Sequence, residues 1–283
     1  MKKERLFVYS VLLNVVLIVI LGGLAYHKRH RFVEITEYYF KTQNDSVVYN
    51  NSNPKEEDLR NFNNEPLEAV NDSIIIGAKK TISCLFLGNS LSYCGVAKEE
   101  PDKEKRGLTS TSKEKDFIHV LVRKISKNKK VNVKYSILNI SQFERTFTVH
   151  SFSMSKLQLA NNKQPDFLFV QIGENVASED IKNPAKFEEE YTNLLSLFPN
   201  AKKIIMIPFW PEKNRTYAIT RVAIKNNSYL VDLSHLGNGT DPKNYASSQR
   251  KYENPAVGAH PGDYGFANIA ECIYATFNAL WSN

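Results

Sequence analysis

The chain has 283 residues, of which 42% are hydrophobic and 24% are charged. This composition excludes a wholly disordered chain and supplies enough apolar residues for one large domain or two small ones. Three cysteines are too few for a disulfide framework, and no C-x-x-C spacing typical of a zinc site occurs. We therefore expect no metal. Because glycine-rich phosphate-binding loops are also absent, we expect no cofactor either.

The net charge of +7 is concentrated near the N-terminus. Residues 1–31 carry six basic side chains against the single acid Glu4, a net charge of +5. The other 252 residues carry 31 basic and 29 acidic side chains, a net charge of +2. A nucleic-acid-binding protein needs a basic patch on its folded body, so we predict no nucleic-acid partner.

Between two basic clusters, residues 6–26 form an uncharged, apolar run of 21 residues. As a helix rising about 1.5 Å per residue, this run would span about 30 Å, the thickness of a bilayer core. We favour an uncleaved, single-pass membrane anchor, because the run is longer than the apolar part of a usual signal peptide and basic residues follow it at once. A cleaved signal peptide, giving a secreted or periplasmic protein, stays open as the alternative.

The anchor leaves orientation open, because positive charge flanks it on both sides. A short inner tail and a large domain outside the cytoplasm is the usual arrangement for this layout. Residues 1–31 thus form the predicted anchor segment. Residues 32–79 are polar and rich in asparagine, which is typical of a stalk or an irregular arm.

From residue 80 onward, short apolar runs rich in β-formers alternate with stretches of helical spacing. We predict strands at residues 81–87, 131–138, 166–172, 203–209 and 229–233. We predict helices at residues 116–128, 146–161, 184–198, 216–225 and 265–280. Nearly continuous apolar strands are expected when both faces of a parallel sheet are covered. Residues 80–283 therefore read as one three-layer α/β domain.

Three polar blocks occupy the places where such a sheet binds ligands, beyond the carboxyl ends of its strands. Gly88-Asn89-Ser90 follows the first strand, and its serine would sit at a helix start that favours developing negative charge. Gly173-Glu174-Asn175 follows the third strand, and its asparagine amide can donate to an oxyanion. His260 precedes the last helix and can take a proton from a serine and return it. Each block alone is a common turn, cap or structural residue.

Taken in this order, the blocks resemble those of the SGNH (GDSL-like) hydrolase family. Gly88-Asn89-Ser90 stands where the family has GDS, Gly173-Glu174-Asn175-Val176 stands where it has GxND, and His260 is followed by proline as in its last block. The resemblance covers about residues 80–282. It implies a flavodoxin-like α/β/α fold and a serine esterase or acyltransferase mechanism. Ser90 would be the nucleophile and His260 the general base and acid, while the Ser90 N–H and the Asn175 amide would stabilise the oxyanion.

The sequence departs from the family pattern beside His260. The family has an aspartate three residues before the histidine, where this chain has Val257. Two alternatives stay open for the group that orients the ring: a backbone carbonyl, giving a Ser–His dyad, or another acid such as Glu253 or Asp241. Asp263, three residues after His260, is expected to cap the last helix and not to act in catalysis.

A second departure lies after the second strand, where residues 139–146 lack the family's oxyanion glycine. Any residue except proline can supply a backbone N–H, and we predict that Glu144 does so. The adjacent pair Glu144-Arg145 either binds a polar substrate or forms a surface ion pair.

Further candidates are weaker. The predicted substrate contacts are Asn89, Arg145, Glu174 and Trp210. Packing of Trp210 in the core or at its rim is an equally open alternative. We expect the three cysteines to be unpaired thiols, with a Cys84–Cys272 bridge as the alternative.

Three functions are compatible with these features. The first is a membrane-anchored serine esterase that removes small O-acyl groups, most simply acetyl, from a glycan or another envelope substrate. The second is an O-acyltransferase that modifies surface polysaccharide, in which a sugar hydroxyl replaces water as acceptor. The third is a non-catalytic glycan-binding protein on a degenerate hydrolase fold. The expected partners are an acylated carbohydrate or other small ester, and the membrane.

Overall fold

The computed structural model describes residues 69–94, 106–147 and 164–281. The chain divides into two compact units, residues 1–58 and 59–283, and all described residues belong to the second. The predicted membrane helix at residues 6–26 and most of the predicted arm lie outside the described residues. Within the three described ranges, no helix is both long enough and apolar enough to cross a bilayer.

A six-stranded sheet with the order β1-β3-β2-β4-β5-β6 forms the centre of the described unit. Its strands are β1 (Ala69–Ile74), β2 (Thr81–Gly88), β3 (Asn132–Asn139), β4 (Phe167–Gln171), β5 (Lys202–Ile207) and β6 (Tyr229–Asp232). Strands β2 to β6 are mutually parallel, and β1 pairs antiparallel with β3. Counted along the chain, the five parallel strands have the order 2-1-3-4-5, which is the flavodoxin-like arrangement. The predicted three-layer α/β fold with a parallel sheet is confirmed, whereas the N-terminal transmembrane helix predicted to precede it stays a prediction.

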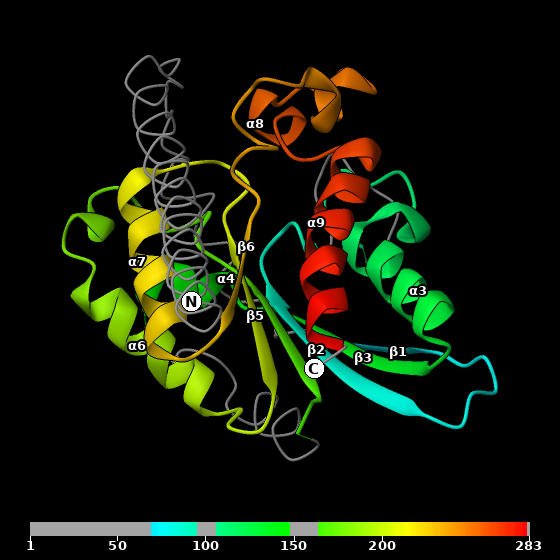
Figure 1. The fold of residues 1–283 in the computed structure, drawn as a ribbon. Helices are drawn as coiled ribbons and strands as arrows, with labels where there is room; N and C mark the ends of the chain where they lie inside the picture. Colours follow the sequence, from blue (N-terminus) through cyan, green and yellow to red (C-terminus); the bar gives the residue numbers. More distant parts are fainter. Residues whose placement is uncertain (1–68, 95–105, 148–163, 282–283) are drawn as a thin grey trace, which may run out of the picture. The chain divides into compact units, whose positions relative to one another are not determined.

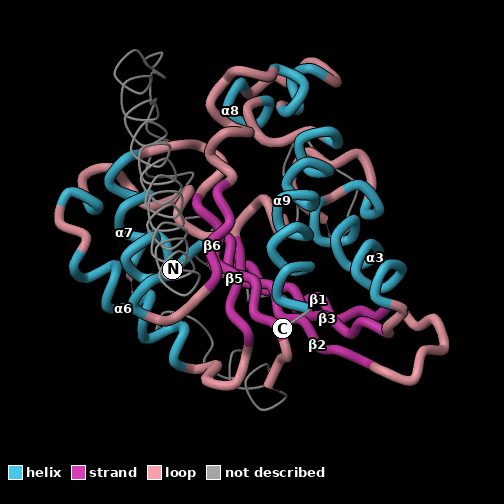
Figure 2. The backbone as a smooth tube through the Cα atoms, viewed as in Figure 1, coloured by secondary structure: helices cyan, strands magenta, loops and turns pink. Residues whose placement is uncertain are grey.

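Helices cover both faces of the sheet (Figures 1 and 2). One face carries α3 (Phe117–Lys129) and α9 (Asp263–Trp281), and the other carries α6 (Ala185–Ser196) and α7 (Lys213–Lys225). The short helices are α4 (Ser141–Thr146) and α8 (Pro255–Gly258). Each face has its own buried apolar cluster, and β4, shared between them, is buried at all five residues. This two-sided burial explains the continuous apolar strands of the sequence.

Strand β1 and the short helices α4 and α8 have no counterpart among the predicted elements, and the helix predicted at residues 146–161 lies mostly outside the described residues. Strand β1 falls inside the predicted arm, because its polar sequence AVNDSI reads as a linker although it forms an edge strand, where polar residues are tolerated. Helix α4 is too short to show a helical period. The predicted helix at residues 146–161 overlaps the described residues only at the end of α4, where Phe147 adopts a left-handed conformation.

The register of three strands brings the candidate residues to one edge. Gly88 at the end of β2 pairs with Asn139 at the end of β3 and with Gln171 at the end of β4. The N–H of Ile140, which precedes α4, donates to the Gly88 carbonyl at 2.6 Å. The segments that follow these strands therefore start side by side at the carboxyl edge of the sheet.

Candidate active site

Ser90 lies in a tight turn directly after β2. The Asn89 carbonyl accepts from the N–H groups of Ser92 and Tyr93, both at 3.0 Å, and the fully buried Leu91 holds the turn against the core. A Cβ on Gly88 would lie 1.9 Å from the Ser92 hydroxyl oxygen, so only glycine fits where the strand enters this turn. The turn presents Ser90 at the edge of the sheet.

The structure places His260 against Ser90. The Ser90 Oγ and His260 Nε2 atoms are 3.2 Å apart, and His260 Nδ1 lies 2.9 Å from the carbonyl oxygen of Ala256. A carbonyl only accepts hydrogen bonds, so Nδ1 must carry the proton and Nε2 presents its lone pair to the serine hydroxyl. This is the tautomer that a general base needs.

Within the described part of the chain, the group that contacts Nδ1 of the ring is a backbone carbonyl and not an acid. Val257 stands in the short helix α8, one residue beyond the Ala256 carbonyl that the ring contacts. Of the two alternative acids, Asp241 accepts from the N–H of Lys243, and Glu253 is exposed in the loop before α8. Among the described residues, neither contacts His260. The geometry is that of the dyad alternative.

Trp210 fixes the loop that carries His260. Its ring stands edge-on to the imidazole, with centroids 4.9 Å apart, and its Nε1 donates to the Ala259 carbonyl at 3.2 Å. Burial by the surrounding protein lowers the pKa of His260 to about 4, so the ring is neutral at pH 7. Trp210 thus supports the histidine, while its contact with substrate stays a prediction.

Asp263 has a structural role, but not the expected one. It is the first residue of α9, and its carboxylate accepts from the N–H and hydroxyl of Thr111 at 2.9 and 2.6 Å and from Lys115 at 2.9 Å. The carboxylate thereby ties the start of α9 to the loop before α3. The expectation that Asp263 is not the catalytic acid agrees with these contacts.

A network of buried polar side chains lies beneath Ser90. Asn89 is fully buried, and its amide nitrogen donates to Glu144 at 3.1 Å and to Glu174 at 2.9 Å. Both carboxylates and the core enclose the Asn89 side chain, and its predicted contact with substrate stays a prediction. Glu174 also accepts from Gln171 at 2.5 Å and from the N–H of Phe209 at 3.0 Å, and its contact with substrate stays a prediction.

Glu144 is the centre of this network. Its side chain is fully buried and accepts from the amide nitrogen of Asn175 at 2.6 Å and from the N–H groups of Gly173 and Asn175. Arg145 beside it is exposed, so the predicted Glu144–Arg145 surface ion pair is wrong: neighbouring helical residues point in different directions. A substrate contact by Arg145 stays a prediction.

The predicted oxyanion donor is the backbone N–H of Glu144 and not its side chain. Glu144 is the fourth residue of α4, where a helical N–H normally has the carbonyl before the helix as acceptor. Its role as an oxyanion donor stays a prediction, as do the oxyanion roles of Ser90 and Asn175. The contact between the Glu144 carboxylate and Asn175 was not predicted from the sequence.

Two carboxylates in one buried network perturb each other. Burial, and then the charge of Glu174, raises the pKa of Glu144 to about 7. Burial also raises the pKa of Glu174, opposed by the hydrogen bonds from Phe209 and Asn89 and by the positive charge of Arg215. The pKa of each carboxyl is therefore raised above its ordinary value within the same buried network.

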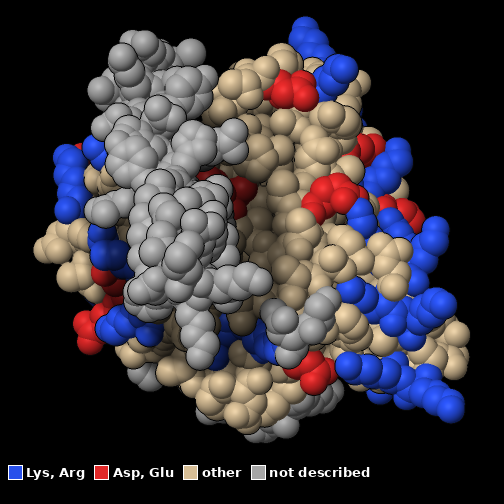
Figure 3. Space-filling model, in the orientation of Figure 1, with Lys and Arg blue, Asp and Glu red and all other residues tan. Residues whose placement is uncertain are grey.

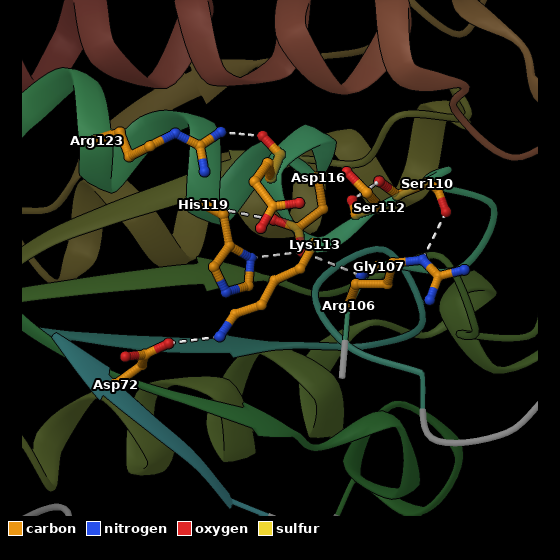
Figure 4. Close-up of polar contacts among 10 residues, drawn as sticks. Asp72, Arg106, Gly107, Ser110, Ser112, Lys113, Asp116, His119 and Arg123 are labelled. Atoms are coloured by element: carbon orange, nitrogen blue, oxygen red, sulfur yellow. Dashed lines mark hydrogen bonds and ion pairs between the residues drawn. The ribbon is translucent and has the colours of Figure 1, made fainter. Parts of the chain in front are cut away.

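A second polar cluster holds the loop before α3 (Figure 4). Asp116 is fully buried, and its carboxylate accepts from His119 Nδ1 at 2.6 Å, from the His119 N–H at 2.8 Å and from the Gly107 N–H at 3.3 Å. The same loop reaches the active site, since the Leu108 N–H donates to the Ser90 carbonyl at 2.9 Å and the Thr109 hydroxyl to the Pro261 carbonyl at 2.8 Å. The cluster thus braces both candidate catalytic residues from one side.

The remaining predictions concern metals, thiols and surface charge. No group of three or more His, Cys, Asp or Glu side chains in the described part of the chain is placed to hold a metal. Cys84 is buried and Cys272 lies near His235, and the two do not form a disulfide. In Figure 3, Lys and Arg side chains gather along the edge formed by α3, with acidic side chains among them. The exclusion of a nucleic-acid partner stays a prediction.

No family model and no curated protein matches the chain. Among solved structures it is similar to the acetyl xylan esterase AlAXEase, with 16% identity and a TM-score of 0.46 over 69% of this chain and 98% of that one. A lipase/acylhydrolase from Enterococcus faecalis has 16% identity and a TM-score of 0.48, over 70% of this chain and 96% of that one. A family 3 carbohydrate esterase from Clostridium thermocellum has 16% identity and a TM-score of 0.48, over 71% of this chain and 97% of that one. At this identity the likeness to these esterases and this acylhydrolase concerns the fold alone.

Proposed function

We propose that this protein is a serine esterase that removes small O-acyl groups, most simply acetyl, from a glycan or another substrate of the cell envelope. The observation that supports it is the contact of 3.2 Å between Ser90 Oγ and His260 Nε2, with Nδ1 held by the Ala256 carbonyl. The base is in hydrogen-bond reach of the nucleophile on one side and of the orienting group on the other, which is the arrangement that activates a serine.

The reaction follows from this geometry. His260 accepts the hydroxyl proton of Ser90 while the serine oxygen attacks the ester carbonyl. The negative charge that develops on the carbonyl oxygen is stabilised by the Ser90 N–H and the Asn175 amide. His260 then gives the proton to the departing sugar hydroxyl, leaving an acyl-serine. Water, deprotonated by the same histidine, releases the acyl group and restores Ser90.

A test uses the full chain in detergent with p-nitrophenyl acetate and a serine-directed fluorophosphonate probe. We expect turnover and labelling by the wild type, and loss of both in Ser90→Ala. Ser92→Ala is a matched control, because the Ser92 hydroxyl is buried two residues away and has no hydrogen-bond partner among the described residues. Equal labelling of wild type and Ser90→Ala would contradict the proposal and favour a non-catalytic role.

Membrane anchoring through residues 6–26, with the enzyme domain outside the cytoplasm, is a separate part of this proposal. Its support is the uncharged run of 21 residues between basic clusters. After expression in a bacterial host, the protein should stay in the membrane pellet through alkaline carbonate extraction and keep its N-terminus. A soluble product that begins after about residue 25 would show a cleaved signal peptide instead.

A further inference from the structure

Asn175, which would bind the oxyanion, makes two contacts with Glu144. Its side-chain nitrogen donates to one carboxylate oxygen of Glu144 at 2.6 Å, and its backbone N–H lies 3.3 Å from the other. A second donor, the N–H of Gly173, also points at this carboxylate. Gly173 has a φ of +130°, and a Cβ there would lie 2.7 Å from Pro208, so the turn that supplies this N–H depends on glycine.

These contacts determine which end of the Asn175 amide faces which way. An asparagine amide can turn by half a rotation, exchanging its oxygen and nitrogen, and only its surroundings select one orientation. An ionised carboxylate only accepts hydrogen bonds, so Glu144 selects the orientation with nitrogen toward itself. That nitrogen carries a second N–H, which has no acceptor among the described residues and stays available to a ligand.

The carboxylate is itself held from several sides. Asn89 donates to both Glu144 and Glu174, and Glu174 is tied to the N–H of Phe209 after β5. The network therefore connects the ends of β2, β4 and β5 to α4. A charge that is buried and hydrogen-bonded in this way cannot easily turn or move away.

We infer that Glu144 is a positioning residue that holds the amide nitrogen of Asn175 toward the oxyanion during ester cleavage. This inference rests on the proposed function, since it assigns a task within that reaction. It also accounts for a glutamate in the segment where the related family has an oxyanion glycine: the segment contributes a side chain that orients a neighbouring donor.

The first test is Glu144→Gln in the full chain. Glutamine has the same shape as glutamate, but one of its two terminal atoms is an amide nitrogen that donates hydrogen bonds. Its oxygen is needed by Gly173, so its nitrogen faces Asn175 and turns that amide, which places oxygen where the oxyanion forms. We expect kcat to fall about 100-fold, as for loss of one oxyanion donor, with KM changed only a few-fold. A raised KM with unchanged kcat would contradict the inference.

A double-mutant cycle separates positioning from general stability. If Glu144 acts through Asn175, then Glu144→Gln should cause no further loss in an Asn175→Ala background. Asp116→Asn is the matched control, because Asp116 is an equally buried carboxylate that contacts no member of this network. Whatever loss it causes should multiply with that of Asn175→Ala. Multiplicative losses for Glu144→Gln as well would overturn the inference.

A measurement on the wild type keeps the inference testable if Glu144→Gln does not fold. The side-chain amide protons of Asn175, assigned by their disappearance in Asn175→Ala, should give one strongly downfield NMR signal from the hydrogen bond to a carboxylate. Two ordinary amide signals would overturn the inference. This signal does not depend on catalysis, so it distinguishes failure of the contact from failure of the proposed esterase, which the Ser90→Ala assay tests separately.

Discussion

His119 and His260 have opposite surroundings in the same domain. His119 is buried, and its Nδ1 lies 2.6 Å from the carboxylate of Asp116. Its Nε2 has no hydrogen-bond partner among the described residues. His260 has a serine at 3.2 Å, and among the residues placed by the structure a backbone carbonyl alone contacts its other ring nitrogen. The histidine that pairs with an acid is thus the one that has no nucleophile beside it. A buried His–Asp pair therefore indicates a structural clamp as readily as a catalytic site, and position at the edge of the sheet decides between them.

The two histidines also show what the missing acid changes. The Ala256 carbonyl selects the same imidazole tautomer that an aspartate would select, but it contributes no negative charge to stabilise a protonated ring. Burial without such a charge lowers the pKa of His260 to about 4. We infer that this site is a weaker base than a full triad and depends more on stabilisation of the oxyanion.

The largest expected effect on activity comes from removing His260, and the removal of His119 is the comparison. His260→Ala should lower kcat/KM by at least about 1000-fold, because Ser90 loses its base. His119→Ala should change kcat/KM only a few-fold but lower the free energy of unfolding by about 1–3 kcal/mol, because the buried Asp116 loses a hydrogen-bond partner. Esterase kinetics and urea unfolding measure the two effects. A large catalytic loss in His119→Ala would break the comparison.

The next effect is the pH dependence of kcat/KM. Protonation of Glu144 would place an O–H donor against the donors of Gly173 and Asn175, so activity should decrease by about tenfold for each pH unit below 7. The titratable groups that face Glu144 are Glu174 and Tyr191, and the charged Arg215 lies beyond Glu174. The expected loss of activity below pH 7 is therefore assigned to the Glu144–Glu174 pair.

The control for this pH limb is Asn175→Ala. Its residual activity should no longer depend on Glu144 and should decrease only as His260 is protonated near pH 4. The sign is the same for both groups: each supports catalysis in its deprotonated form, and activity is lost as the pH falls through its pKa. An unchanged limb near pH 7 in Asn175→Ala would contradict the assignment.

A smaller effect is expected when the family's acid is restored. Val257→Asp introduces a carboxylate where it can stabilise protonated His260, which should raise the pKa of the ring by about 1–2 units. Titration of the His260 ring signals by NMR measures this shift directly. Val257→Asn is the control, since it is polar but uncharged. A shift of equal size in both variants would show that charge is not its cause.

The smallest effect concerns the support of the His260 loop. Trp210→Phe keeps an aromatic ring beside the imidazole but loses the hydrogen bond to the Ala259 carbonyl, worth about 1 kcal/mol, so kcat should fall about fivefold. Trp281→Phe is the matched control: Trp281 ends α9 and stacks with Phe167 at the start of β4, at the opposite edge of the sheet. An equal loss of kcat in both variants would contradict a local role for Trp210.

The sequence alone determined the parallel strands, the flanking helices and the order of Ser90, Asn175 and His260. These features are local: a strand buried on both faces is a continuous apolar run, and a turn after it is marked by glycine and polar residues. The polar edge strand β1 and the short helix α4 lack such a signal, and so the tertiary structure was needed to find them.

The tertiary structure decided what surrounds the three candidate residues. The carbonyl behind His260 has no sequence signature, because every residue has one. Glu144 and Asn175 are 31 positions apart, and only the register of β2, β3 and β4 brings them into contact. The same register buries the Asn89 side chain between the carboxylates of Glu144 and Glu174. Local pattern thus identified the candidate reacting groups, whereas the groups that orient them depend on burial and long-range pairing, which a linear pattern does not encode.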